Sequence, residues 1–340
     1  MPPADDDLPW YLAALLGIAA WVAAGFLFGF FVTLFTDLFR QPGFTGTLGA
    51  ICCMSALGLM RYARGKPFVE QFAVALSLAG QVLCGVALHE ALDDIEPHAL
   101  GTRLAWAGTS ALALAMVLLG PVALHRFVSG ALCAAALALS MSIEASLPAR
   151  AMAAPLLAAL AVGLWRVTEW APALRGGPLP MPARLSPLAW GITLVALVML
   201  WMGADLGNSW EFRDQAVTTL RMWHWLGSAA IVALLPMCVA WLARGRAWRW
   251  RWVGAAAVFA LLLAGAPGVA FGMALVLLGF GLHRPALLGV GLLGMAIYLI
   301  RYYYQLDVSL LQKSGWLLAA GAALLLARLV WRRIAPEGAA

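Results

Sequence analysis

The stretch VEQFAVALSLAGQVLCGVALH, residues 69–89, decides the fold class of this chain. Apart from Glu70 near its start and His89 at its end, the run is almost free of ionisable side chains. A helix rises 1.5 Å per residue, so a run of this length spans a hydrocarbon core of about 30 Å. The stretch therefore predicts a transmembrane α-helix.

Runs of the same kind recur along the whole sequence. They predict an all-α fold, a polytopic transmembrane bundle of about twelve helices. Several runs are short, so the pattern leaves eleven or twelve crossings open. In addition to 69–89, the predicted crossings are 10–35, 44–60, 104–120, 122–143, 151–167, 187–204, 221–242, 251–266, 268–282, 285–301 and 314–331.

The composition agrees with a membrane protein. Of the 340 residues, 64% are hydrophobic and only 11% are charged, whereas soluble domains are about half apolar and about a quarter charged. No polar stretch is long enough to fold as a soluble domain, so residues 1–340 are expected to form a single integral-membrane domain. The net charge of +6 is attributed to basic loops that set topology, and no nucleic-acid partner is expected.

A Pro/Gly-rich segment, residues 169–185, interrupts the series of runs. Such a composition is typical of a linker. It divides the chain into possible halves, 1–168 and 186–335, each with six predicted helices. Two groups of six resemble the parallel-repeat transporters in helix count alone, because the halves share no repeat at the level of residues.

The stretch between Arg251 and Arg284 carries no charge but is too long for one crossing. Its centre reads Ala266-Pro267-Gly268, which is a turn signal. We therefore predict a hairpin of two short helices.

Basic residues predict the orientation, because cytoplasmic loops of membrane proteins are enriched in Lys and Arg. With both termini in the cytoplasm, 15 of the 22 basic residues fall on the inner side. The N-terminus carries three aspartates and is not expected to be a cleavable signal. We predict a bacterial inner-membrane location. The seven basic residues on the outer side are then Arg40, Arg103, Arg150, Arg213, Arg221, Arg301 and Lys313.

Arginines alternate with tryptophans before the run 251–266. On the cytoplasmic face this pattern predicts an anchor to anionic lipid headgroups, with the indole rings at the same depth. The predicted anchor consists of Arg244, Arg246, Arg249, Arg251, Trp248 and Trp250.

Polar residues gather near the outer ends of several predicted helices. If these helix ends converge, the residues form an outward-facing polar site; otherwise they are charges that meet water. Arg221 could pair with a carboxylate of such a site, and Tyr302 to Tyr304 could wall it. The candidate site residues are His89, Glu90, Glu144, Asp205, His224 and Asp307.

Few polar or special residues lie inside the predicted helices. Gln81 is the clearest one, and we expect it to hydrogen-bond a neighbouring helix. Gly25 and Gly29 form a Gly-xxx-Gly pair that favours close helix contact. The five cysteines lie in apolar runs and are expected to serve in packing. No catalytic or cofactor motif is present, so we expect no catalytic residues, no metal and no cofactor.

Three stretches carry a resemblance to a known family. They are Pro9-Trp10-Tyr11, the segment EQFAVALSLAGQ at 70–81 and the segment YYYQLDVSLLQKS at 302–314. Together they resemble the domain-of-unknown-function 4401 family of multipass bacterial inner-membrane proteins. The resemblance implies no established activity. It also implies a partner, a small membrane-anchored protein with a Gly-Asp-Tyr-x-x-Leu-x-Tyr motif.

Three functions are compatible with these patterns. The first is a membrane partner or scaffold that assembles with another envelope protein through its periplasmic face, supported by the polar outer rim. The second is a small-solute transporter with six plus six helices, although no acid near the midplane supports ion coupling. The third is a membrane enzyme acting on a lipid-linked substrate, which lacks any recognisable motif. An enzyme is therefore less expected than the other two.

Overall fold

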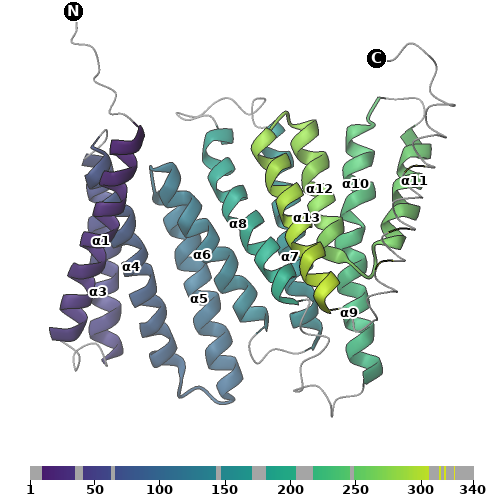
Figure 1. Ribbon diagram of the computed structural model, residues 1–340. Coiled ribbons are helices and arrows are strands. Elements are labelled where there is room, and N and C mark those ends of the chain that lie inside the picture. The colour runs from purple at the N-terminus through teal and green to yellow at the C-terminus, as the bar shows by residue number, and fades with distance from the viewer. Residues whose placement is uncertain are drawn as a thin grey trace, which may run out of the picture.

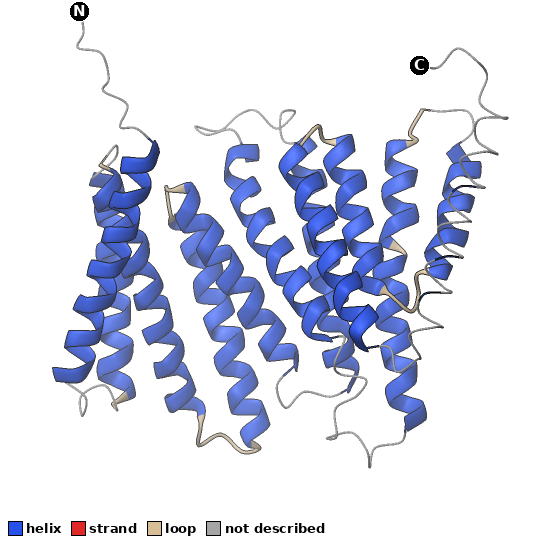
Figure 2. Cartoon of the chain, in the orientation of Figure 1, coloured by secondary structure: helices blue, strands red, loops and turns tan. Residues whose placement is uncertain are grey.

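The computed structural model describes residues 10–34, 41–62, 66–142, 147–170, 181–203, 217–245 and 249–305, together with residues 314, 318 and 325. Throughout these residues the regular structure is helical (Figure 2). The helices are α1 (Trp10–Leu34), α3 (Pro42–Tyr62), α4 (Pro67–Leu92), α5 (His98–Leu119), α6 (Ala123–Ser142), α7 (Leu147–Trp170), α8 (Met181–Gly203), α9 (Val217–Val232), α10 (Leu234–Leu242), α11 (Arg249–Leu262), α12 (Pro267–Gly281) and α13 (Pro285–Gln305).

Proline sets where several of these helices begin. Pro42, Pro67, Pro267 and Pro285 are the first residues of α3, α4, α12 and α13. The first turn of a helix has no intrahelical acceptors for its N–H groups, so a residue without an N–H is tolerated there. Pro267 thus begins a new helix within the stretch between Arg251 and Arg284, which carries no charge.

Among the described residues, seven helices are long and apolar enough to span a membrane. The protein is therefore membrane-embedded. The helical segment Met222–Leu242 counts as one such span although it contains a break at Ala233, between α9 and α10. Pro236 explains the break, because it cannot donate a hydrogen bond to the preceding turn.

Eleven of the twelve predicted crossings correspond to helices when α9 and α10 are counted as one rod. The twelfth, 314–331, lies almost entirely outside the described residues. The two short helices predicted at 251–282 are present as α11 and α12, separated by residues 263–266. They do not form the predicted tight hairpin, because α11 packs on α10 whereas α12 packs mainly on α13. Moreover, helices of 14 and 15 residues extend only about 21 and 22 Å. Each is therefore shorter than a full crossing.

The helices stand side by side in chain order for much of the bundle (Figure 1). α4 contacts α1, α3, α5 and α6, and α5 and α6 also contact each other. α6 continues to α7 and α8, and α8 contacts α12 and α13. At the far side, α10 contacts both α11 and α12 (Figure 1).

The predicted division into two halves stays a prediction, and the contact between α6 and α8 bears on it. A Cβ on Gly191 of α8 would lie 2.7 Å from the backbone of Phe127 and of Ala131 on α6. Gly130 of α6 in turn faces Leu188 of α8. Helices on either side of the predicted linker therefore pack backbone to backbone.

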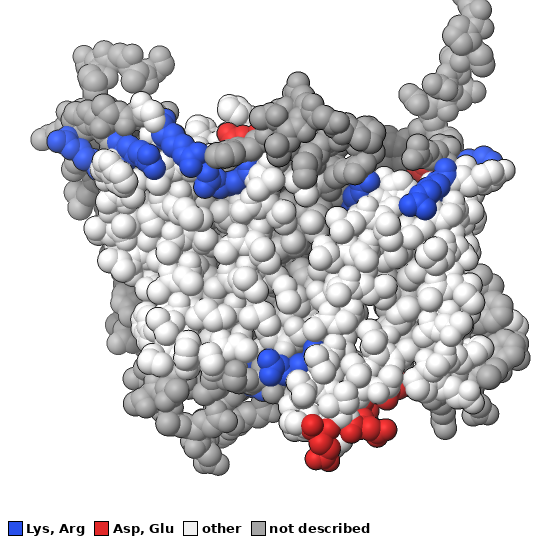
Figure 3. Space-filling model, turned by 180° about the vertical axis from the view of Figure 1, so that it is seen from behind, with Lys and Arg blue, Asp and Glu red and all other residues white. Residues whose placement is uncertain are grey.

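Charge is distributed unequally between the two ends of the bundle (Figure 3). On the face shown, the Lys and Arg side chains of the described residues gather mainly at one end, and most of the described Asp and Glu side chains lie at the other. The first end includes the starts of α4, α6 and α11, and the second includes the turn between α4 and α5. They are called the basic end and the acidic end below.

Candidate functional site

The closest approach of α3 and α4 is built from two glycines. A Cβ on Gly80 would lie 2.7 Å from the carbonyl oxygen of Gly49, and a Cβ on Gly49 would lie 2.8 Å from that of Gly80. Such close approach is available only to glycine. The thiols of Cys53 and Cys84 sit against these glycines and donate to the carbonyls of Ser77 and Gly46. This packing brings α4 close to α3 and fixes the direction of the adjacent face of α4.

That adjacent face of α4 meets α6 through polar side chains. Gln81 is 1% exposed, and its Nε2 donates to Ser129 Oγ on α6 at 3.1 Å and to Ser77 Oγ at 3.2 Å. His125 is also 1% exposed, and its Nε2 lies 2.9 Å from Ser77 Oγ and 3.5 Å from Ser129 Oγ. The expected bond from Gln81 to a neighbouring helix is thus confirmed. The four side chains form one cluster between two membrane helices.

Two atoms of this cluster have no hydrogen-bond partner among the described residues. They are Gln81 Oε1 and His125 Nδ1. In a membrane interior an unpaired polar atom costs several kcal/mol. The cluster therefore has one acceptor and one ring nitrogen left to bind something further.

Gly120 makes room for the imidazole. A Cβ at this position would collide with His125 Nδ1. The carbonyl of the same residue accepts a 2.8 Å bond from Nε of Arg126, which is 7% exposed. Arg61 of α3 donates to the neighbouring carbonyl of Leu119 at 3.4 Å. The loop between α5 and α6 thus holds two arginines and the histidine at the basic end.

Polar positions continue from the cluster toward the acidic end. Ser110 of α5 donates to the carbonyl of Cys133 on α6 at 3.0 Å. Thr109, 4% exposed, lies 3.1 Å from where a Cβ of Gly85 on α4 would be. Farther along, the ring of His89 meets Trp106 edge to face, with centroids 5.0 Å apart. Trp106 Nε1 is buried and has no hydrogen-bond partner among the described residues.

These polar positions define a seam, which runs through the contact of α4, α5 and α6. Its polar members at the basic end are His125, Ser77 and Ser129, those in the middle are Gln81, Ser110 and Thr109, and those at the acidic end are His89 and Trp106.

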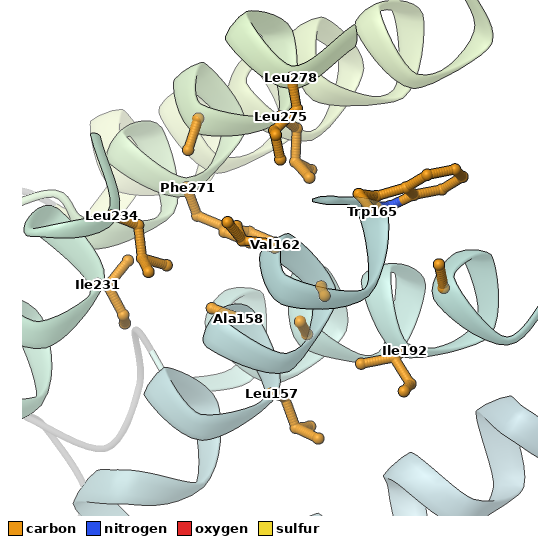
Figure 4. Close-up of a cluster of buried hydrophobic side chains, with 14 of the residues drawn as sticks. Leu157, Ala158, Val162, Trp165, Ile192, Ile231, Leu234, Phe271, Leu275 and Leu278 are labelled. Atoms are coloured by element: carbon orange, nitrogen blue, oxygen red, sulfur yellow. The ribbon is translucent and has the colours of Figure 1, made fainter. Parts of the chain in front are cut away.

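The largest buried cluster of the bundle is apolar and has most of its residues on α7, α8, α10 and α12, with further members on α5, α6, α9 and α13 (Figure 4). Phe271, Leu275 and Leu278 of α12 face Ala158 and Val162 of α7. At the basic end of this core, Trp165 donates from Nε1 to Thr193 Oγ1 at 2.9 Å. Arg284 stacks 5.1 Å above the Trp165 ring and donates to Ser186 Oγ at 3.0 Å. These polar contacts of the apolar core therefore lie at its edge, at the basic end of the bundle.

The predicted outward-facing site is described only in part. His89 and Glu90 end α4, and Glu90 is exposed. His224 is exposed on α9, on the opposite side of the bundle from α4 (Figure 1). The structure therefore does not bring His224 together with His89 and Glu90, because the two helices are separated by other helices. Glu144, Asp205 and Asp307 lie outside the described residues.

Other sequence expectations have mixed outcomes. In the predicted lipid anchor, Arg244 and Arg251 are exposed and Arg249 stacks 5.1 Å from the Trp250 ring centroid. Arg246 and Trp248 lie outside the described residues. The expected close contact at Gly25 and Gly29 is not formed within the described residues, none of which has an atom within 4 Å of a Cβ built on either glycine.

Sequence reasoning missed most of the seam. Ser77 and Gln81 are four residues apart, and so are His125 and Ser129. This spacing places each pair on one face of its helix. It is the signal that could have found the cluster, but only the packing of α4 against α6 reveals that the two faces meet.

The model of a family described as Domain of unknown function (DUF4401) matches residues 9–334. No curated protein and no solved structure matches the chain.

Proposed function

Since the chain belongs to the family described as Domain of unknown function (DUF4401), a description that names no activity, we propose that it is an assembly partner in the bacterial inner membrane. In this proposal the bundle anchors the protein, and its acidic end binds a basic segment of another envelope protein on the periplasmic side. The partner implied by the family resemblance is the small membrane-anchored protein with the Gly-Asp-Tyr-x-x-Leu-x-Tyr motif.

The observation that supports this proposal is the ordered acidic turn between α4 and α5. The carboxylates of Glu90, at the end of α4, and of Asp93, Asp94 and Glu96, in the turn, are all exposed. A cluster of negative charges attracts a positively charged partner as the two proteins associate, and it contributes to the choice of partner. The acidic turn is therefore suited to a basic partner.

The local fold holds these carboxylates in place. The backbone N–H of Ile95 donates to Leu92 at 3.2 Å, and Nδ1 of His98 lies 2.9 Å from the carbonyl oxygen of Asp93. Gly101 lets the first turn of α5 lie directly against Leu92, where any larger residue would collide. A preformed surface loses less conformational entropy on binding than a mobile one.

Orientation forms part of the proposal. The basic end is assigned to the cytoplasm by the positive-inside rule, which places both termini there and the acidic turn in the periplasm. Reporter fusions test this assignment: a fusion at Asp94 is expected to give a periplasmic signal, and one at Ala340 a cytoplasmic signal. For the segment between α11 and α12, Gly265 is exposed and open. A Gly265→Cys variant is expected to react with a small thiol reagent added from the periplasm.

Photo-crosslinking in cells tests the assembly. A photoreactive amino acid at Asp94 is expected to capture the motif-bearing partner when the two proteins are co-expressed. The same amino acid at Tyr62, which is 88% exposed at the basic end, is the control and is expected to capture none.

Variants without the negative charges test whether capture depends on the acidic turn. The triple variant Asp93→Asn, Asp94→Asn and Glu96→Gln is expected to lose capture. Glu169→Gln removes an exposed carboxylate at the basic end and is expected to leave capture unchanged. Equal capture by the triple variant and the wild type would contradict the proposal.

A further inference from the structure

The seam contains three polar atoms that the protein itself does not satisfy. Gln81 Oε1 is an acceptor, Trp106 Nε1 is a donor, and His125 Nδ1 is either, depending on the tautomer. Apart from the Nε atoms of arginines, these are the buried side-chain nitrogens and oxygens without a partner in the described part of the chain. Their gathering on one three-helix contact, rather than across the bundle, marks the seam as a place that binds a polar species.

The width of the seam limits the size of that species. A Cβ on Gly85 would lie 3.1 Å from Thr109, and a Cβ on Gly108 would lie 3.1 Å from Leu88. Gly80 is in backbone contact with α3. Helices packed this closely exclude molecules larger than water. Water also satisfies both donors and acceptors, as these three atoms require.

We propose that α4, α5 and α6 enclose a file of bound water that carries protons across the membrane, with His125 and His89 exchanging protons at its two ends. The proposal is independent of the assembly partner, because it concerns the interior of the bundle and not the acidic turn.

The chemistry of His125 suits such a role. A proton from water at Nδ1 forms the imidazolium, and Nε2 then releases a different proton toward the hydroxyl oxygens of Ser77 and Ser129. Each hydroxyl accepts one proton and passes its own proton on, so no net charge stays behind once the imidazole returns to its first tautomer. The Gln81 amide does not relay protons; its Oε1 accepts a hydrogen bond from water and holds that water in the file.

The charges around His125 leave it without a fixed counter-ion. Arg126 and Arg61 bond to the carbonyls of Gly120 and Leu119 beside it, and no carboxylate hydrogen-bonds to the ring within the described residues. The thiol of Cys53 faces the carbonyl of Ser77 on the other side of α4. A protonated His125 is therefore held only transiently, which is what a conducting site requires and a permanent ion pair would prevent.

Proton flux through the purified full-length protein tests the proposal. Vesicles containing a pH-sensitive dye receive the protein, and valinomycin with a potassium gradient sets the membrane potential. The wild-type protein is expected to change the internal pH faster than protein-free vesicles do. Gln81→Leu is expected to return the rate to the protein-free level, because an isobutyl group removes the acceptor and fills the file.

Gln71→Leu is the matched control. Gln71 is also on α4, but its Oε1 accepts a bond from Trp21 of α1 at 3.2 Å and lies off the seam. The flux of this variant is expected to equal that of the wild type. If the wild-type protein carries no flux above protein-free vesicles, or if Gln81→Leu conducts as well as Gln71→Leu, the proposal is overturned.

A second measurement does not depend on any variant. Magnetisation transfer from water to the labelled side chains of His125 and Gln81, measured by solid-state NMR in bilayers, reports whether water reaches the seam. We expect transfer to be much faster than to Leu157, which is 1% exposed in the apolar core. Transfer as slow as that to Leu157 would also overturn the proposal.

Discussion

The seam of α4, α5 and α6 and the apolar core of α7, α8, α10 and α12 are both buried, but they are built from different side chains. In the core, Phe271, Leu275 and Leu278 are fully buried among other apolar groups. In the seam, Gln81 and His125 are almost as completely buried, and each leaves one polar atom unpaired. Lipid offers polar groups no partners, so retained polar groups at such depth mark function more strongly than apolar ones.

Each region includes a helix that packs against a neighbouring helix through glycines. The α3–α4 pair closes on Gly49 and Gly80, and the α12–α13 pair closes on Gly272 and Gly291, where a Cβ on Gly291 would lie 2.8 Å from the carbonyl of Gly272. In lipid, helices associate through van der Waals contact and hydrogen bonds, so close backbone approach stabilises both pairs. Shape complementarity is therefore common to the two regions, and only polarity separates them.

The largest expected effect comes from breaking a glycine contact. Gly80→Leu places a side chain against the backbone of α3, where a Cβ alone would lie 2.7 Å from the carbonyl of Gly49. We expect a loss of about 3 kcal/mol in the free energy of unfolding, the upper part of the range for overpacking. Titration from mild detergent into dodecyl sulfate, followed by tryptophan fluorescence, measures it.

Two further glycines calibrate this effect. Gly291→Leu is expected to cost a similar amount, since α12 and α13 meet in the same way. Gly58→Leu on α3 meets open space within 4 Å and is expected to cost almost nothing. A large loss with Gly58→Leu would show that added bulk on α3, rather than the contact with α4, is responsible.

The next effect is a cavity in the apolar core. Phe271→Ala removes a ring that is 0% exposed. Lipid is as apolar as the core, so only the cavity contributes, and the expected cost is about 2 kcal/mol. Phe280→Ala on the same helix removes a ring that is 71% exposed and is expected to be neutral in the same unfolding titration. Equal losses from both variants would contradict the assignment of the core.

Sequence reasoning could predict the helices but not which faces meet. Runs such as 69–89 predict crossings because their length and lack of charge are local properties. The turn before Pro267 was predicted for the same reason. The order of the helices in the bundle is not a local property, however. His89 and His224 lie on opposite sides of the bundle for this reason. His125 and Ser77, which are 48 residues apart in the sequence, are in contact for the same reason. The predicted convergence of the outer polar residues depended on that order.

Glycine contacts show the same limit. Gly25 and Gly29 have the sequence signature of a contact motif but face open space in the structure. Gly49 and Gly80 belong to different helices, so no spacing of residues within one helix predicts their contact. A small residue permits close approach, but a partner at the matching height is what makes the contact form.

A smaller effect is expected at the basic end of the seam. Gly120→Ala puts a Cβ against His125 Nδ1, which displaces the imidazole from Ser77 and Ser129. The backbone at Gly120, with φ −71° and ψ 130°, accepts alanine, so only the contact changes. We expect a loss of about 1 kcal/mol, the size of one or two hydrogen bonds between membrane helices.

A double-mutant cycle isolates this contact. In a His125→Ala background the ring is absent, so Gly120→Ala is expected to cost nothing further. An equal cost in both backgrounds would show that alanine disturbs the loop itself and not the histidine.

The smallest effect on stability is expected at Gln81. Gln81→Leu removes the bonds to Ser77 and Ser129, and single hydrogen bonds between membrane helices contribute about 0.6 kcal/mol on average. It also removes the unpaired Oε1, whose burial is costly, so the two contributions oppose each other. The free energy of unfolding is therefore expected to change by less than about 0.6 kcal/mol. Gln71→Leu, which removes the bond from Trp21, is expected to give a change of similar size.

The comparison with Phe271 depends on this result. If Gln81 can be replaced at almost no cost in stability, its role is not to stabilise the fold, whereas Phe271 does stabilise it. If Gln81→Leu instead destabilises the protein as much as Phe271→Ala, the seam is a structural contact like the core, and the contrast between the two regions disappears.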